Sequence, residues 1–189
     1  IAELQALVDD VDLDRPLGDT GAALHEVARL YLDHAVWFHE PHLPIESDPK
    51  FQANYPDILK TDPDKAQHHC NITQADDAFG RLMKALADMN LEGDTIVIFT
   101  SDNGPEGNGL TMRTRGSTGG LRGRKRSVYE GGTRVPFMVR WPGHAPAGKT
   151  SDQPVVGTDI FPTLCTITNT PTPKDRVIDA VSIVPAFSG

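Results

Sequence analysis

The sequence has 189 residues, a net charge of −8, and 38% hydrophobic and 23% charged residues. This length allows one domain with its own hydrophobic core. The negative charge argues against a nucleic-acid-binding protein, because phosphate binding requires clustered cations. No apolar run is long enough to span a bilayer.

The first elements are short and are followed by a proline-rich segment. Residues 1–13 lack the cationic start of a signal peptide, and without an initiator Met the chain is expected to begin inside a longer protein. Residues 22–31 are predicted to form a short amphipathic helix or to lead into a strand, and residues 35–38 a buried strand. Pro41 and Pro44 then exclude regular structure.

The middle of the chain carries the clearest periodic patterns. A helix is predicted over residues 64–89, where apolar residues recur at spacings of three and four. Residues 95–100 form a continuous β-branched and aromatic run, which is typical of a parallel strand buried on both faces. Residues 135–141 are predicted to form another strand, with a proline near its start.

The C-terminal part contains one more helix and one extended segment. Residues 159–168 predict a short helix with Pro162 in its first turn, where the missing N–H costs least. Residues 177–187 predict a last strand or extended segment. The order of elements indicates an α/β protein with a mostly parallel sheet flanked by helices.

Asp102, Asn103 and Gly104 directly follow the predicted strand 95–100. A carboxylate and an amide oxygen side by side suit a hard cation such as Ca²⁺ or Mg²⁺. The alternative interpretation is an Asx-turn at a strand end.

A histidine in the proline-rich segment is a candidate acid. His42 lies between Pro41 and Pro44, and a stiffened backbone can hold an imidazole in place to protonate a leaving oxygen. His39 is a rival for this role, and an exposed loop histidine is the alternative for both. His68 and His69 are interpreted as surface or capping residues.

A basic loop interrupts this acidic sequence. Between positions 113 and 126 there are six cationic residues and no acid, which suggests a local anion site or a solvated arginine-rich loop. Lys125, flanked by glycine-rich sequence, is the candidate for binding a sulfate or phosphate oxygen.

Three further residues leave their roles open. Cys70 and Cys165 could pair or remain buried thiols, because two cysteines define neither a disulfide framework nor a metal site. Asn71 begins an Asn-Ile-Thr triplet that fits a glycosylation acceptor, although such triplets are common by chance.

Several segments, in their order, resemble the sulfatase family of the alkaline phosphatase superfamily. They begin with residues 38–44 and 91–105, are strongest at residues 121–137 with 141–143, and continue with residues 157–164 and 179–182. The resemblance implies an alkaline phosphatase-like α/β fold that is incomplete at its N-terminus. Residues 1–189 would then be one partial catalytic domain, without the half that carries the nucleophile and without the small C-terminal domain.

The resemblance also implies roles for individual residues. Asp102 and Asn103 match calcium ligands, Lys125 matches the lysine that holds the sulfate, and His42 matches the histidine that contacts the sulfate and protonates the leaving alcohol. The family nucleophile is a formylglycine made from a Cys/Ser-x-Pro/Ala-x-Arg segment. Neither Cys70 nor Cys165 has that context, so the chain alone is expected to be inactive. It is also expected to bind calcium weakly, because Asp102 and Asn103 are two ligands for an ion that takes about six to eight oxygens.

The resemblance predicts calcium-dependent hydrolysis of a sulfated small molecule or glycan in the full-length protein. The alternatives are a phosphodiesterase or phosphonate hydrolase of the same superfamily, or a non-catalytic binder of sulfated glycans. Arg124 and Arg126 occupy positions where members of the family often have glycine. An unpaired sheet edge would favour self-association, and the family suggests a periplasmic, secreted or lysosomal location.

Overall fold

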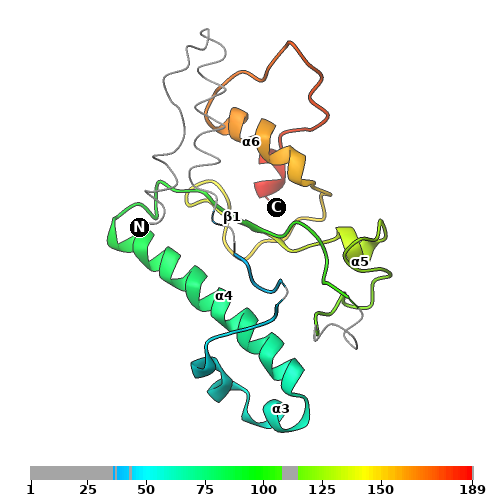
Figure 1. The fold of residues 1–189 in the computed structure, drawn as a ribbon. Coiled ribbons are helices and arrows are strands. Elements are labelled where there is room, and N and C mark those ends of the chain that lie inside the picture. The colour runs from blue at the N-terminus through cyan, green and yellow to red at the C-terminus, as the bar shows by residue number, and fades with distance from the viewer. Residues whose placement is uncertain (1–35, 37, 43, 108–114, 189) are drawn as a thin grey trace, which may run out of the picture. The chain divides into compact units, whose positions relative to one another are not determined.

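The computed structural model describes residues 36, 38–42, 44–107 and 115–188 (Figure 1). The chain divides into two compact units, Phe38–Gly143 and a second that joins Ile1–Trp37 to His144–Gly189. Each unit is considered by itself. The helix predicted at 22–31 lies outside the described residues, as do Ala35 and Trp37 of the predicted strand 35–38; Val36 and Phe38 are not in a strand.

A long helix organises the first unit. α4 spans Pro63–Asp88, as the sequence predicted, and the Asp62 side chain caps it by accepting a hydrogen bond from the Lys65 N–H. The predicted apolar face meets the sheet where the ring of Phe79 packs edge-on against Phe99, with centroids 5.6 Å apart. The fully buried residues lie in the N-terminal half of the helix.

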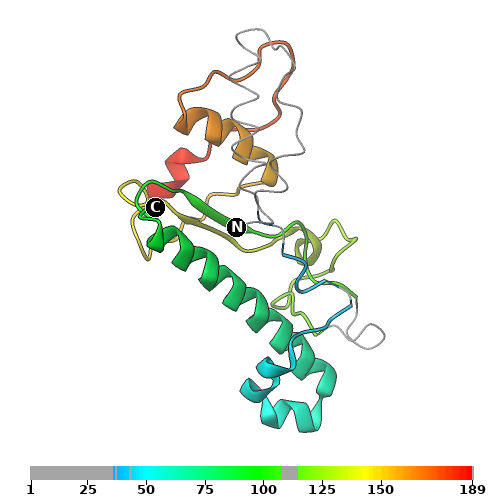
Figure 2. The ribbon, with the colours of Figure 1, turned by 60° about the vertical axis from the view of Figure 1, so that its left-hand side comes forward.

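Two short helices pack against that N-terminal half (Figure 2). η1 spans Pro49–Asn54 and α3 spans Pro56–Thr61. Tyr55 and Thr73 share a hydrogen bond of 2.6 Å between their hydroxyls, and the Asp48 N–H donates to Gln74 Oε1 over 2.8 Å. These bonds fix the segment that leads from the proline-rich stretch into α4.

The described strands form a two-stranded sheet. β1 (Val97–Thr100) pairs with β2 (Phe137–Arg140), with Val97 opposite Arg140 and Thr100 opposite Phe137. The pairing is antiparallel, so the expected parallel arrangement is not confirmed. β1 is also half-buried rather than buried on both faces, because each strand has a single neighbour among the described residues.

The described part of the second unit is built around Asp159. η2 (Gly157–Asp159) leads into α6 (Ile160–Ile167), which confirms the predicted helix, and η3 (Val184–Ser188) ends the chain where a strand or extended segment was predicted. The Asp159 carboxylate accepts from the N–H groups of Val156 and Val181, each over 3.0 Å. No described helix has the length and apolar character needed to cross a membrane.

Candidate functional site

The loop after β1 and the basic loop are packed together through their backbones. Gly104 N–H donates to Gly132 O over 2.9 Å, and Lys125 N–H donates to Pro105 O over 3.1 Å. The second loop is closed on itself by Gly131 N–H, which donates to Arg122 O over 2.8 Å. The structure therefore brings the Asp102–Asn103 loop beside the segment that carries Lys125.

Glycines make this approach sterically feasible. A Cβ on Gly104 would lie 2.0 Å from Gly131 O, and a Cβ on Gly131 would lie 2.3 Å from Gly123 O. The same holds for Gly132, whose Cβ would lie 2.1 Å from Ser127 O. Gly131 and Gly132 belong to the short helix α5 (Glu130–Thr133). A side chain at Gly104 would force the two loops apart, whereas side chains at Gly131 and Gly132 would disrupt the folding of the basic loop on itself.

Asp102 and Asn103 carry side-chain oxygens that no described residue engages, and the calcium site expected there stays a prediction. The exposed carboxylate of Asp102 has no hydrogen-bond or ion-pair partner among the described residues. Asn103 Nδ2 donates to Gly104 O over 3.1 Å, and its Oδ1 accepts no bond from a described residue. The two residues, adjacent in sequence, thus each offer a side-chain oxygen. Because calcium takes about six to eight oxygens and no described group of three acidic, His or Cys residues could hold a metal, other ligands would be needed.

Lys125 is held beside a buried carboxylate that the sequence reasoning missed. Its Nζ lies 3.5 Å from Oε2 of Glu106, and the side chains of Lys125 and Glu106 are 19% and 8% exposed. The other oxygen, Oε1, pairs with the guanidinium of Arg126 and accepts from Gly107 N–H over 3.1 Å. The Arg126 hydrogen bond lowers the pKa of Glu106 against the opposing effect of burial, and the charges of Arg126 and Lys125 lower it further.

Much of the remaining basic loop has structural partners. Arg115 bridges Asp62 and Asp64 at 3.2 and 3.5 Å, and Arg124 donates to Gly116 O over 2.9 Å. The Arg122 guanidinium lies 3.8 Å from the centre of the Tyr129 ring. A uniformly solvated arginine loop is therefore the wrong interpretation of these residues, while Arg113 lies outside the described residues.

His42 lies in an exposed turn together with its rival. The His42 N–H donates to His39 O over 2.8 Å, and the two rings are 5.4 Å apart. The Glu40–Pro41 peptide between them is cis, and Glu40 Oε1 accepts from Gln74 Nε2 of α4 over 2.7 Å. This bond ties the turn to the long helix. That His42 converges with Lys125 and Asp102 on one pocket stays a prediction.

Two polar residues of α4 proved to be buried. His68, interpreted as a surface or capping residue, is 8% exposed, and its Nδ1 has no hydrogen-bond partner among the described residues. Burial lowers the pKa of His68, and the charges of His69 and Arg115 add to this effect. Asn71 is 2% exposed and its amide donates to Glu46 O over 2.6 Å, so a folded chain does not present it for glycosylation.

The cysteines are buried free thiols. Neither Cys70 nor Cys165 is in a disulfide, and burial raises the pKa of each thiol. Raised values keep the thiols protonated and unreactive. Within its own unit, each cysteine is a buried thiol.

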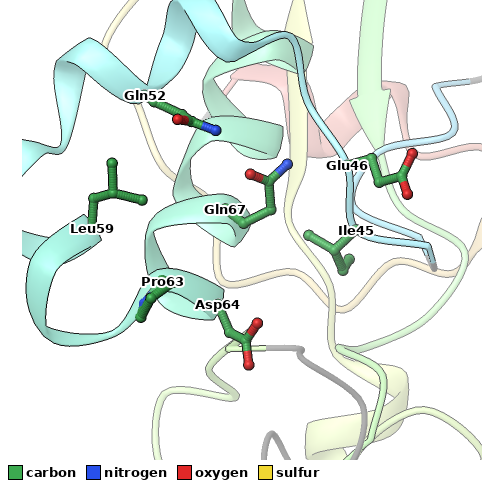
Figure 3. A pocket seen from close by; sticks show the side chains of 7 residues that line it. All are labelled: Ile45, Glu46, Gln52, Leu59, Pro63, Asp64 and Gln67. Atoms are coloured by element: carbon green, nitrogen blue, oxygen red, sulfur yellow. The ribbon is translucent and has the colours of Figure 1, made fainter.

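A separate cavity of about 290 Å³ lies between η1, α3 and the start of α4 (Figure 3). None of the predicted site residues lines it. Its walls are formed by Ile45, Glu46, Gln52, Leu59, Pro63, Asp64 and Gln67.

Comparison with known proteins identifies the family. The family model "Sulfatase" matches residues 35–170, and the chain belongs to this family. Human steryl-sulfatase is 35% identical over 121 residues, which are 62% of this chain and 21% of that protein. The chain therefore spans about a fifth of the length of this curated relative.

Solved structures share the fold. Ps i-CgsB superposes with a TM-score of 0.71 and 27% identity, over 89% of this chain and 37% of that one. BT4656, solved with its substrate D-glucosamine-2-N,6-O-disulfate, gives a TM-score of 0.53 and 25% identity over 65% of this chain and 22% of that one. The alkaline phosphatase-like class expected from the sequence is thus supported at the level of the family fold.

Proposed function

We propose that the complete protein containing this chain hydrolyses sulfate esters, and that Asp102, Asn103, Lys125 and His42 form part of its active site. One observation carries the proposal. In a chain of the sulfatase family, the loop with Asp102 and Asn103 is hydrogen-bonded to the segment with Lys125.

The proposed metal is calcium, held in part by the side-chain oxygens of Asp102 and Asn103. Bound there, calcium would supply positive charge that stabilises the negative oxygens of the transferring sulfate group. The remaining ligands, and the formylglycine expected to supply the attacking oxygen, would come from outside the sequence of this chain. Two points support this division: neither Cys70 nor Cys165 has the expected formylglycine context, and Asp102 and Asn103 offer two side-chain oxygens to an ion that takes about six to eight.

Lys125 and His42 would act on opposite ends of the bond that breaks. The Lys125 ammonium would bind a non-bridging sulfate oxygen and stabilise charge that builds up there. His42 in its protonated form would give its proton to the alcohol oxygen as the sulfur–oxygen bond breaks, so that a neutral alcohol leaves. Burial beside Glu106 keeps Lys125 in place for this task.

The proposed substrate is a sulfated small molecule or glycan. Its class follows from relatives that include a steryl-sulfatase and a protein whose substrate is a disulfated glucosamine. A phosphodiesterase or phosphonate hydrolase would use the same cations, but the matched relatives favour sulfate. Binding of sulfated glycans without turnover is the third alternative.

The test is turnover of an aryl sulfate and of the corresponding aryl phosphate diester by the complete protein with calcium. We expect sulfate hydrolysis, and we expect Lys125→Ala to lower kcat/KM by about 10²-fold or more. Lys84→Ala removes an exposed lysine that pairs with Asp88 and should leave turnover unchanged. Faster turnover of the phosphate diester would favour the phosphodiesterase, and glycan binding without any turnover would favour the non-catalytic binder.

A further inference from the structure

One cation of the basic loop, residues 113–126, differs from its described neighbours in its partner. The Arg122 guanidinium lies 3.8 Å from the centre of the Tyr129 ring, and no described residue accepts a hydrogen bond from it or forms an ion pair with it. The other described cations of the loop have oxygen partners: Arg115 pairs with Asp62 and Asp64, Arg124 donates to Gly116 O, and Lys125 and Arg126 pair with Glu106. The five N–H donors of Arg122 are therefore available to an acceptor from outside the described chain.

The backbone fixes Arg122 beside Tyr129. Arg122 O accepts from Gly131 N–H over 2.8 Å, and Tyr129 O accepts from Gly132 N–H over 2.7 Å, so both residues are anchored to α5. Gly123 permits this approach, because its φ is +87° and a Cβ there would lie 3.0 Å from Tyr129 Cβ. A cation held over an aromatic ring keeps its charge and has lost rotamer freedom before a ligand binds, which lowers the cost of ordering it around an anion.

The acidic residue next to this pair is engaged elsewhere. Glu130 follows Tyr129 in sequence, and its carboxylate pairs with Arg134 over 3.3 Å. Arg122 thus keeps a positive charge that no described carboxylate compensates, in a chain whose net charge is −8. A guanidinium binds the oxygens of a sulfate or carboxylate through two parallel N–H···O bonds. The position of Arg122 therefore suits an oxyanion supplied by a ligand.

The spacing relates this position to the proposed active site. Arg122 precedes Lys125 by three residues, so their Cα atoms are at most about 11 Å apart. Two charged groups on one sugar, or on adjacent sugars of a glycan, are separated by distances of this order or less. One ligand with two oxyanions could thus engage both cations.

We propose that Arg122 is a second anion-binding residue of the substrate site, and that the substrate carries another oxyanion, a sulfate or a carboxylate, besides the sulfate ester bound by Lys125. Binding of the first anion makes binding of the second intramolecular, which raises affinity without a new contact at Lys125. Tyr129 is then a positioning residue that acts through Arg122. This inference rests on the proposed function, since it places the first anion at Lys125.

Calorimetric titration of the complete protein with linear sulfonates tests the inference. A sulfonate resembles a sulfate ester in charge and shape, but its carbon–sulfur bond is not hydrolysed. Each α,ω-alkanedisulfonate is compared with the alkanemonosulfonate of the same length, and a series of lengths measures the spacing between the two anions. Wild type should bind the disulfonate of optimal length about tenfold more tightly than its monosulfonate.

A third ligand distinguishes the two sources of the second oxyanion. The ω-sulfonatocarboxylate of optimal length carries a carboxylate in place of one sulfonate. If it binds more tightly than the disulfonate, the second group of the substrate is a carboxylate. If it binds more weakly than the disulfonate but more tightly than the monosulfonate, the second group is a sulfate.

Arg122→Gln should reduce the ratio of disulfonate to monosulfonate affinity to about one. A merely structural role of Arg122 would lower both affinities alike and leave this ratio unchanged, which would overturn the proposal. Arg124→Gln is the matched control, because it removes the same charge two residues away, where the guanidinium donates to Gly116 O. Its ratio should stay within about twofold of wild type. An equal loss in Arg124→Gln would show a general charge effect and overturn the proposal as well.

Turnover separates this inference from the proposed function. If the complete protein hydrolyses no aryl sulfate, the proposed function fails, while the sulfonate ratio still measures the role of Arg122. A wild-type ratio near one at every chain length, or no binding of any disulfonate, would overturn the inference whatever the turnover.

Discussion

Replacing Gly104 with alanine should separate the two loops of the candidate site. The new Cβ would lie 2.0 Å from Gly131 O, whereas ordinary van der Waals contact begins near 3.4 Å. The position of the new Cβ is fixed by the backbone of residue 104, and the Gly131 carbonyl is part of the backbone itself. Neither atom can therefore rotate out of the contact. Relief of the overlap therefore requires the loops to move apart by more than 1 Å.

The cost can be worked out from the contacts that this movement breaks. The hydrogen bonds Gly104 N–H to Gly132 O and Lys125 N–H to Pro105 O are 2.9 and 3.1 Å long, so neither survives such a shift. Each is worth about 1 kcal/mol net, and the alternative of tolerating the overlap costs about 1–3 kcal/mol. Either way, Gly104→Ala should lower the free energy of unfolding by about 2 kcal/mol.

Denaturant unfolding of the purified complete protein measures this loss, and its turnover of an aryl sulfate reports the geometry. Misplacing Lys125 by about 1 Å should reduce turnover by about 10²-fold. Gly80→Ala is the control, because a Cβ on Gly80 in α4 meets nothing within 4 Å and should stabilise the helix by about 0.5–1 kcal/mol. The reasoning is refuted if Gly104→Ala unfolds within about 0.5 kcal/mol of wild type and keeps its turnover.

Three further outcomes are expected. Asp102→Ala in the complete protein should abolish sulfate-ester turnover while circular dichroism remains native, since the calcium site loses both charge and geometry; near-normal turnover would contradict the metal assignment. Burial lowers the pKa of His68 below its usual value of 6.5, so just below pH 6.5 the unfolded chain binds a proton there that the folded chain does not. The free energy of unfolding should therefore fall as the pH drops through this range. His68→Gln should make this pH dependence shallower, and the same dependence in His68→Gln and wild type would contradict the role of His68. The purified 189-residue chain should neither hydrolyse an aryl sulfate nor bind calcium in the low micromolar range, because two protein oxygens are too few for tight binding; either activity would show that the site is misassigned.

Two helices of the described chain, α4 and α6, could be predicted because their signals are local. Asp62 and Pro63 mark the start of α4, and Pro162 lies in the first turn of α6. Strand direction has no comparable local signal. The apolar run that forms β1 fits either direction, and the pairing of β1 with β2 depends on how residues 101–136 return to the sheet.

The proximity of the Asp102 loop and the Lys125 segment was predictable, but the internal pairing of their side chains was not. Sequence order and resemblance placed Asp102 and Lys125 in one site, and the structure packs their loops together. Glu106 was missed, because its burial arises from the contact between two loops distant in sequence. Its position four residues after Asp102, facing a basic loop, was the available signal. The burial of His68 was missed because it depends on tertiary packing around α4 rather than on helix periodicity.

A crystal structure of the complete protein with calcium and inorganic sulfate tests the proposed active site most directly. We expect a calcium ion about 2.3–2.6 Å from side-chain oxygens of both Asp102 and Asn103, with a sulfate oxygen about 2.7–2.9 Å from Lys125 Nζ. A calcium ion bound away from Asp102, or a sulfate that leaves Lys125 untouched, would contradict it.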